Sequence, residues 1–374
     1  MTTSTGFAAR GILAALILLA FSGSPPSAAT SPGATSPAAT SPAAVEESSR
    51  IPFTQRYQAV HHGGIVRAAN SSITCRTAKS TAPSSCSSVK TGASGTNGDF
   101  EMFYIDEDDD ANTYNSSRAE LVLPKSSRVS YARLYWGGNL RVGEQKPPKD
   151  NGRILITEPG GKYKEVLADT QIAHRDTDGS DAFQASADVT PLVRQSGSGL
   201  YTVTQINVAM GYSGVGSWGG WTLVVAYENS TEPLRHVSIW DGFETLDADR
   251  RSHDIALAGL RIPARAAARA GFVSYDGDRG VSGDAVNVVA DQGKAFELAS
   301  STNPATDIMN STITGPGNPM KRQPAHVNTL GYDSDVFDIS PALASGGSRL
   351  NFTFSAENLG YFLGVLFVQA DTRR

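Results

Sequence analysis

The sequence predicts an all-β fold that consists of two tandem β-sandwich domains, jelly-roll-like in topology and related by internal duplication. Three observations lead to this prediction. Short apolar runs separated by polar turns recur from residue 51 onward, the 37 glycines supply turns, and helix-sized periodic segments are almost missing from the sequence. We expect the first domain, with an N-terminal extension, at residues 51–250 and the second at residues 251–374.

The clearest predicted strand is WTLVVAY, residues 221–227. Its large side chains alternate with small or β-branched ones, which is typical of a strand buried on both faces. Turn-forming residues follow at 229–233, and an extended run resumes at 234–243. We interpret this second run as the exit from the first domain toward the second.

Segments of the first half recur in the same order in the second half, which indicates a duplication. The matched pairs are 123–137 with 262–276, DVTP at 188–191 with DISP at 338–341, and 221–227 with 362–368. Because strand-turn-strand segments of unrelated β-proteins also resemble one another, chance similarity is the alternative.

The N-terminus predicts export. Residues 1–29 combine Arg10, the short apolar run 11–21 and small residues at 27–29, the pattern of a secretory signal peptide. The TSPA-type repeats that follow predict a disordered linker at residues 30–50. We expect a secreted, extracellular protein without a transmembrane anchor in its mature chain, either released or held at the cell surface by non-covalent contacts. A formal net charge of −5 argues against nucleic acid as a partner.

The two cysteines, Cys75 and Cys86, are predicted to form a disulfide, because the predicted destination is an oxidising compartment. The bridge would close a short loop rich in Ser, Thr and Lys.

The most acidic stretch is a candidate calcium loop. Asp106, Asp108, Asp110 and Asn112 alternate along the chain, and hard oxygen ligands at such spacing are used by calcium loops. The loop lacks the glycine and the final glutamate of an EF-hand, so a solvated acidic turn is the alternative. No cofactor other than this possible structural calcium is predicted.

Two aromatic residues in a glycine-rich stretch, Tyr212 and Trp218, are candidates for a ligand platform. Exposed aromatic side chains on loops can stack on sugar rings. The alternative is that they belong to the core, where we place Trp221 and Tyr227.

The predicted function is a secreted, non-catalytic interaction module of the bacterial cell envelope or exterior that binds glycan or protein. No pair of nucleophile and base can be named in the sequence. One alternative is a glycan or glycopeptide hydrolase at the junction of the two sandwiches, with Asp176, Asp178, Asp276 and Asp278 as candidate carboxylates. A purely structural envelope protein is the other alternative.

Several motifs together resemble a known family. They are FEMFYIDEDDDANTYNSSRAELVLPKSSRVSYARLYWGG from residue 100, ADVTPLV from residue 187, and GGWTLVVAYENSTEPLRHVSIWDGF from residue 219. The chain is similar over residues 51–370 to an uncharacterised β-rich module of actinobacterial secreted and surface proteins, which often precedes immunoglobulin-like repeats. The resemblance implies an exported, non-catalytic module without an established ligand.

Overall fold

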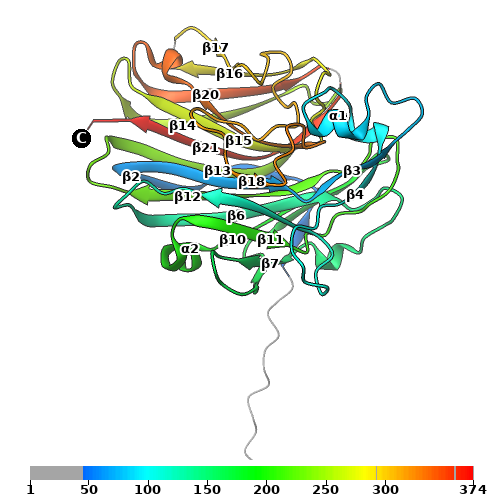
Figure 1. The fold of residues 1–374 in the computed structure, drawn as a ribbon. Helices are drawn as coiled ribbons and strands as arrows, with labels where there is room; N and C mark the ends of the chain where they lie inside the picture. The colour runs from blue at the N-terminus through cyan, green and yellow to red at the C-terminus, as the bar shows by residue number, and fades with distance from the viewer. Residues whose placement is uncertain (1–44, 292, 358, 374) are drawn as a thin grey trace, which may run out of the picture. The chain divides into compact units, whose positions relative to one another are not determined.

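The computed structural model describes residues 45–374 except residues 292, 358 and 374. The predicted signal peptide and residues 30–44 of the predicted linker lie outside the described residues. Residues 44–374 form one compact unit. Figure 1 shows that this unit consists of stacked β-sheets with a few short helices, so the predicted all-β class is confirmed.

The described residues contain these strands in chain order: β1 (Glu47–Ser48), β2 (Ile51–Ser71), β3 (Ile73–Ala78), β4 (Phe100–Tyr104), β5 (Ser116–Leu121), β6 (Arg128–Asn139), β7 (Arg153–Thr157), β8 (Lys164–Leu167), β9 (Ile172–Asp176), β10 (Asp181–Asp188), β11 (Gly199–Thr204), β12 (Gly219–Glu228), β13 (Leu234–Leu246), β14 (Ser252–Ile262), β15 (Ala268–Tyr275), β16 (Asp284–Ala290), β17 (Phe296–Glu297), β18 (Arg322–Gln323), β19 (Tyr332–Asp338), β20 (Gly347–Ala356) and β21 (Tyr361–Asp371). The helical segments are α1 (Cys86–Lys90), α2 (Thr190–Ser196) and the 3-10 turns η1 (Asn97–Asp99), η2 (Pro148–Asp150) and η3 (Ser340–Leu343).

The largest sheet has the order β1-β9-β10-β6-β12-β2-β13-β21-β15-β19, and β2 is its turning point. Residues 63–71 of β2 pair with β12, whereas residues 51–62 pair with β13. The change of partner occurs at Gly63, which has a φ of 138°. A Cβ atom there would lie 2.0 Å from the Tyr227 carbonyl oxygen, so only glycine fits.

The two halves of this sheet face each other. The side-chain amide of Gln184 on β10 donates to the Gly364 carbonyl of β21 at 3.3 Å, although these strands are not neighbours in the sheet. Tyr275 of β15 donates to the same glutamine at 3.1 Å. A cluster of buried aromatic and aliphatic side chains, with Val224 and Phe367 among them, fills the space between the halves.

Two smaller sheets cover the outer faces, as the top and the bottom of the unit in Figure 1 show. The sheet β18-β5-β11-β7-β8 packs on the first half through a core that includes Trp136, Tyr201 and Leu223. The sheet β14-β20-β16-β17 packs on the second half through a core that includes Phe272 and Phe354. Each half is therefore a two-layer sandwich.

The strand order of the first half recurs in the second. The order β10-β6-β12 corresponds to β19-β15-β21, and β5-β11-β7-β8 corresponds to β14-β20-β16-β17. The DVTP and DISP segments also match, because Asp188 accepts a bond from the Thr190 N–H at 2.8 Å and Asp338 from the Ser340 N–H at 2.9 Å. This correspondence supports the internal duplication.

Two predicted boundaries differ from the structure. In the second half, β13 takes the place that β2 has in the first, next to the last strand of the repeat, so the second half begins at Leu234 rather than after residue 250. Glu47 and Ser48, placed in the predicted linker, form β1 and pair with residues 172–173 of β9. A two-residue backbone pairing needs no apolar pattern, and composition therefore gives no sign of it.

Candidate functional site

The predicted aromatic platform of Tyr212 and Trp218 is not formed. Trp218 is 0% exposed, and its ring lies 5.5 Å from the Phe362 ring and 5.6 Å from the Tyr275 ring. Tyr212 is 40% exposed, and its hydroxyl donates to the Thr77 carbonyl at 3.4 Å. The prediction for Trp218 is corrected: the ring fills the space between the two halves of the large sheet, where it replaces water with apolar contacts.

The predicted disulfide is confirmed. Cys75 on β3 and Cys86 at the start of α1 are bonded, with their Cα atoms 5.7 Å apart. The bridge holds α1 against β3 beside a small buried cluster that includes Val89 and Phe100.

The acidic loop uses its carboxylates to form its own turn. Asp108 accepts from the Asp110 N–H at 2.9 Å, Asp110 accepts from the Asn112 N–H at 3.0 Å, and Asp106 accepts from the Ser116 hydroxyl at 3.0 Å. Within the described part of the chain, no group of three or more His, Cys, Asp or Glu residues is placed to hold a metal ion.

The four carboxylates proposed for hydrolysis do not share a sugar-sized pocket in the structure. Asp176 is exposed and pairs with Arg141 at 2.7 Å, and Asp178 is exposed on the same turn. Asp276 and Asp278 line a void of about 10 Å³. Because that volume corresponds to roughly one water molecule, a sugar ring does not fit there.

Asp276 and Asp278 belong instead to a cluster of desolvated carboxylates, completed by Asp284 and Asp333. Burial raises the pKa of Asp278 and of Asp284 to about 7, and it raises the pKa of Asp276 and of Asp333 well above the usual range. None of the four makes an ion pair with a lysine or arginine of the described residues. We call these four residues the carboxylate cluster.

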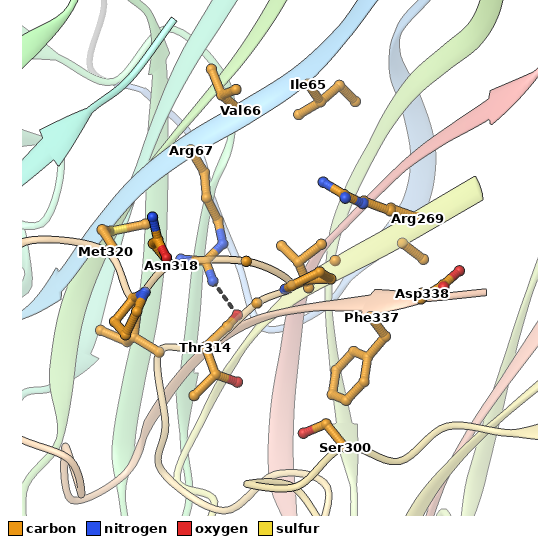
Figure 2. A pocket seen from close by; sticks show the side chains of 18 of the residues that line it. Ile65, Val66, Arg67, Arg269, Ser300, Thr314, Asn318, Met320, Phe337 and Asp338 are labelled. Atoms are coloured by element: carbon orange, nitrogen blue, oxygen red, sulfur yellow. Dashed lines mark hydrogen bonds between the residues drawn. The ribbon is translucent and has the colours of Figure 1, made fainter. Parts of the chain in front are cut away.

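A groove of about 1010 Å³ lies between the two halves, and sequence reasoning did not identify it. Its walls come from residues 65–67 of β2, residues 120–122 at the end of β5, strands β15, β19 and β21, and the loop segments 299–302 and 313–321. Figure 2 shows side chains from these strands and loops around one shared space. These segments are far apart in sequence, and each alone reads as an ordinary strand or loop.

The groove combines apolar and hydrogen-bonding side chains. Ile65, Met320, Val336 and Phe367 are among its apolar residues. The polar and charged lining residues include Arg67, Glu120, Arg269, Asn318, Lys321, Asp338 and Gln369. A concave apolar surface with a few polar groups is typical of small-molecule and glycan sites.

Arg67 is the most unusual residue of the groove. Its Nη2 donates to the Thr314 carbonyl at 2.5 Å, the bond drawn in Figure 2. Its Nε and Nη1 atoms are buried and have no hydrogen-bond partner. Burial lowers the pKa of Arg67 to about 10, although Asp335 and Tyr332 act to raise it. The guanidinium therefore keeps its charge at neutral pH while two of its nitrogens lack acceptors.

Among the described residues, no helix is long and apolar enough to cross a membrane.

Comparison with known sequences identifies one family. The sequence model described as "Protein of unknown function (DUF3344)" matches residues 87–369. No curated protein matches the chain.

Solved structures give only distant similarities. A quercetin 2,3-dioxygenase from Acinetobacter baumannii matches at 9% identity, with 68% of each chain covered and a TM-score of 0.20. A chain from Sulfolobus Turreted Icosahedral Virus also matches at 9% identity and a TM-score of 0.20, with 83% of this chain and 90% of that chain covered. At these TM-scores neither similarity bears on fold or function.

Proposed function

The chain belongs to the DUF3344 family of proteins of unknown function, and we propose that it is an exported, non-catalytic binding module of the bacterial cell envelope or exterior whose ligand site is the groove. An actinobacterial source and a surface or secreted location are part of this proposal. They rest on the resemblance and on the signal-peptide pattern of residues 1–29.

The disulfide supports export. Disulfides persist in oxidising compartments and are rare in the bacterial cytoplasm, so the Cys75–Cys86 bridge agrees with an extracytoplasmic destination.

The groove is the observation on which the binding role rests. Its volume of about 1010 Å³ is at the upper end of the usual range for ligand pockets, roughly 300–1,000 Å³. Because both halves of the molecule line it, the packing of the halves forms the site and holds its walls in place. The apolar side chains can contact the faces of sugar rings, while side chains such as Asn318 and Gln369 can bond to hydroxyl groups. We therefore favour a glycan over a protein as the ligand.

A binding role requires no reactive group, and the groove supplies no arrangement of nucleophile and base. Its two carboxylates, Glu120 and Asp338, are contributed by different halves of the molecule. Asp338 already accepts from the Ser340 backbone N–H and hydroxyl, the latter at 2.5 Å, which leaves it poorly placed as a general acid.

The test is a binding screen with the purified protein on an array of neutral and acidic glycans and on isolated cell-wall fractions. We expect binding to at least one glycan class, and we expect Val336→Trp, which adds bulk to the groove wall, to abolish it. The matched control is Val60→Trp, at a residue that is 54% exposed and does not line the groove. An absence of binding on every surface, or equal binding by Val336→Trp and the wild type, would contradict the proposal.

A further inference from the structure

The base of the groove holds more buried positive than negative charge. Arg67 and Arg322 are close enough for the charge of one to lower the pKa of the other, and burial lowers both pKa values to about 10. Arg322 donates to Asn70 Oδ1 at 3.2 Å and to the His326 carbonyl at 2.9 Å, both neutral acceptors. Asp335 is the carboxylate that acts on both arginines. Two guanidinium groups thus face one carboxylate.

That carboxylate is committed to other partners. Asp335 Oδ1 accepts from the Thr314 N–H at 2.7 Å and from the Thr314 hydroxyl at 2.6 Å. Asp335 Oδ2 accepts from Asn303 Nδ2 at 3.1 Å and from the Thr312 hydroxyl at 3.2 Å. Asp335 makes no ion pair with Arg67 in the structure, so its charge reaches the arginines only through space.

A second arginine enters the groove from another strand. Arg269 on β15 is exposed and makes no hydrogen bond or ion pair with any of the described residues. Figure 2 shows the Arg67 and Arg269 side chains extending into the groove from β2 and β15. Lys321 adds a further cation to the lining, against the carboxylates of Glu120 and Asp338.

An unpaired buried charge costs stability, since removal from water is not offset by a partner. A guanidinium cannot shed its charge at neutral pH. An anion in the groove would supply the missing compensation, and planar carboxylates match the donor geometry of a guanidinium.

We infer that the groove takes an acidic glycan, one that carries a carboxylate such as a uronic acid, with Arg269 as the direct partner of the carboxylate and Arg67 as a positive charge beneath it. This inference rests on the proposed function and names the ligand class of the same site. The apolar side chains Ile65, Val336 and Phe367 would lie against sugar rings, and the carboxylate would extend toward the arginines. The ligand therefore needs both a ring face and a negative charge.

The experiment compares acidic oligosaccharides with matched neutral ones. A panel of uronic-acid oligosaccharides and their carboxyl-reduced forms is titrated into the purified protein by calorimetry at low and at physiological salt. We expect the acidic forms to bind about ten- to a hundredfold more tightly than the reduced forms, because a charge-assisted hydrogen bond is lost on reduction. The difference should shrink as salt rises.

Variants then assign the carboxylate to the arginines. Arg269→Gln should bind acidic and reduced forms equally, and Arg67→Met should weaken binding of the acidic forms while retaining a cooperative unfolding transition. The matched control is Arg261→Gln, an exposed arginine of β14 that does not line the groove, which should bind like the wild type.

The outcomes separate the two claims. Equal affinity for acidic and reduced forms in the wild type overturns the acidic-ligand inference while the proposed glycan site stands. Binding of proteins but of no glycan overturns the inference and the choice of glycan. Acidic binding that survives unchanged in Arg269→Gln overturns the role of the groove arginines.

Discussion

The arginines at the base of the groove and the carboxylate cluster are two sets of buried like charges that respond to burial in different ways. Burial lowers the pKa of Arg67 and Arg322 to about 10, so both remain charged at neutral pH. Burial raises the pKa of Asp278 and Asp284 to about 7, so these carboxylates can take up protons near neutrality.

The difference shows that burial of charge does not by itself identify a ligand site. A carboxylate can become neutral by binding a proton and then donate a hydrogen bond, which relieves repulsion inside a cluster. A guanidinium has no such route at neutral pH and requires an anion. We therefore place the ligand at the arginines, although the sequence directs attention to the aspartates.

The loop at 106–112 is the solvated counterpart of the carboxylate cluster. Burial acts to raise the pKa of Asp108, but bonds from the Tyr163 hydroxyl, the Asp110 N–H and the Thr113 hydroxyl together lower it. Similar runs of aspartate thus have opposite pKa shifts in the two regions.

The largest expected effect is that of Asp335→Ala, which would break the balance at the base of the groove. The variant leaves Arg67 and Arg322 without their nearby carboxylate and removes the acceptor of the Thr314 N–H. We expect a loss of about 3–5 kcal/mol in the free energy of unfolding, the usual cost of leaving a buried charge without its partner. Urea denaturation followed by circular dichroism measures it.

The matched control is Asp109→Ala, which removes an exposed carboxylate that has no hydrogen-bond partner among the described residues. It should change the free energy of unfolding by less than about 0.5 kcal/mol. Equal effects of the two variants would show that the arginines do not depend on Asp335.

An intermediate effect is expected from pH acting on the carboxylate cluster. With folded pKa values of about 7 against 3.8 for an ordinary aspartate, Asp278 and Asp284 are protonated in the folded chain and ionised in the unfolded chain between about pH 4 and 7. The folded state binds more protons there, so stability falls as pH rises through this window and is level above it. The double variant Asp278→Asn/Asp284→Asn should lose this slope and exceed the wild type at pH 8 by on the order of 2–3 kcal/mol.

The measurement is the free energy of unfolding of wild type and double variant from pH 4 to 8, taken as a difference so that other titrating groups cancel. A difference that does not vary with pH would mean that the cluster is not protonated in the folded state. The comparison with the arginines would then fail.

The smallest effect is expected at the acidic loop. Asp108→Asn weakens the bonds that Asp108 accepts from Asp110 and Thr113, at a cost of about 1 kcal/mol. Thermal melts with added calcium and with chelator test the calcium site predicted from the sequence. A rise in Tm with calcium in the wild type that is lost in Asp108→Asn would establish the ion, and identical melts would leave a hydrogen-bonded turn.

Local patterns were enough to predict much of the fold. Alternation of large and small side chains predicts the buried strand at 221–227, which lies within β12, because strand periodicity is a property of the backbone. The paired DVTP and DISP segments predict the repeat, since each aspartate bonds to a backbone N–H two residues ahead. The two cysteines, eleven residues apart, are the only possible pair for a disulfide.

Properties that depend on distant segments were decided by tertiary packing. Trp218 reads as a loop aromatic, yet it is buried because the two halves of the large sheet close over it. The groove unites residues 65–67, Arg269 and residues 313–321, whose spacing in the chain carries no sign of their contact. Burial, and with it the charge state of Asp278 and the unmet hydrogen-bonding of Arg67, follows from this packing, because desolvation depends on which chain segments displace water around a group.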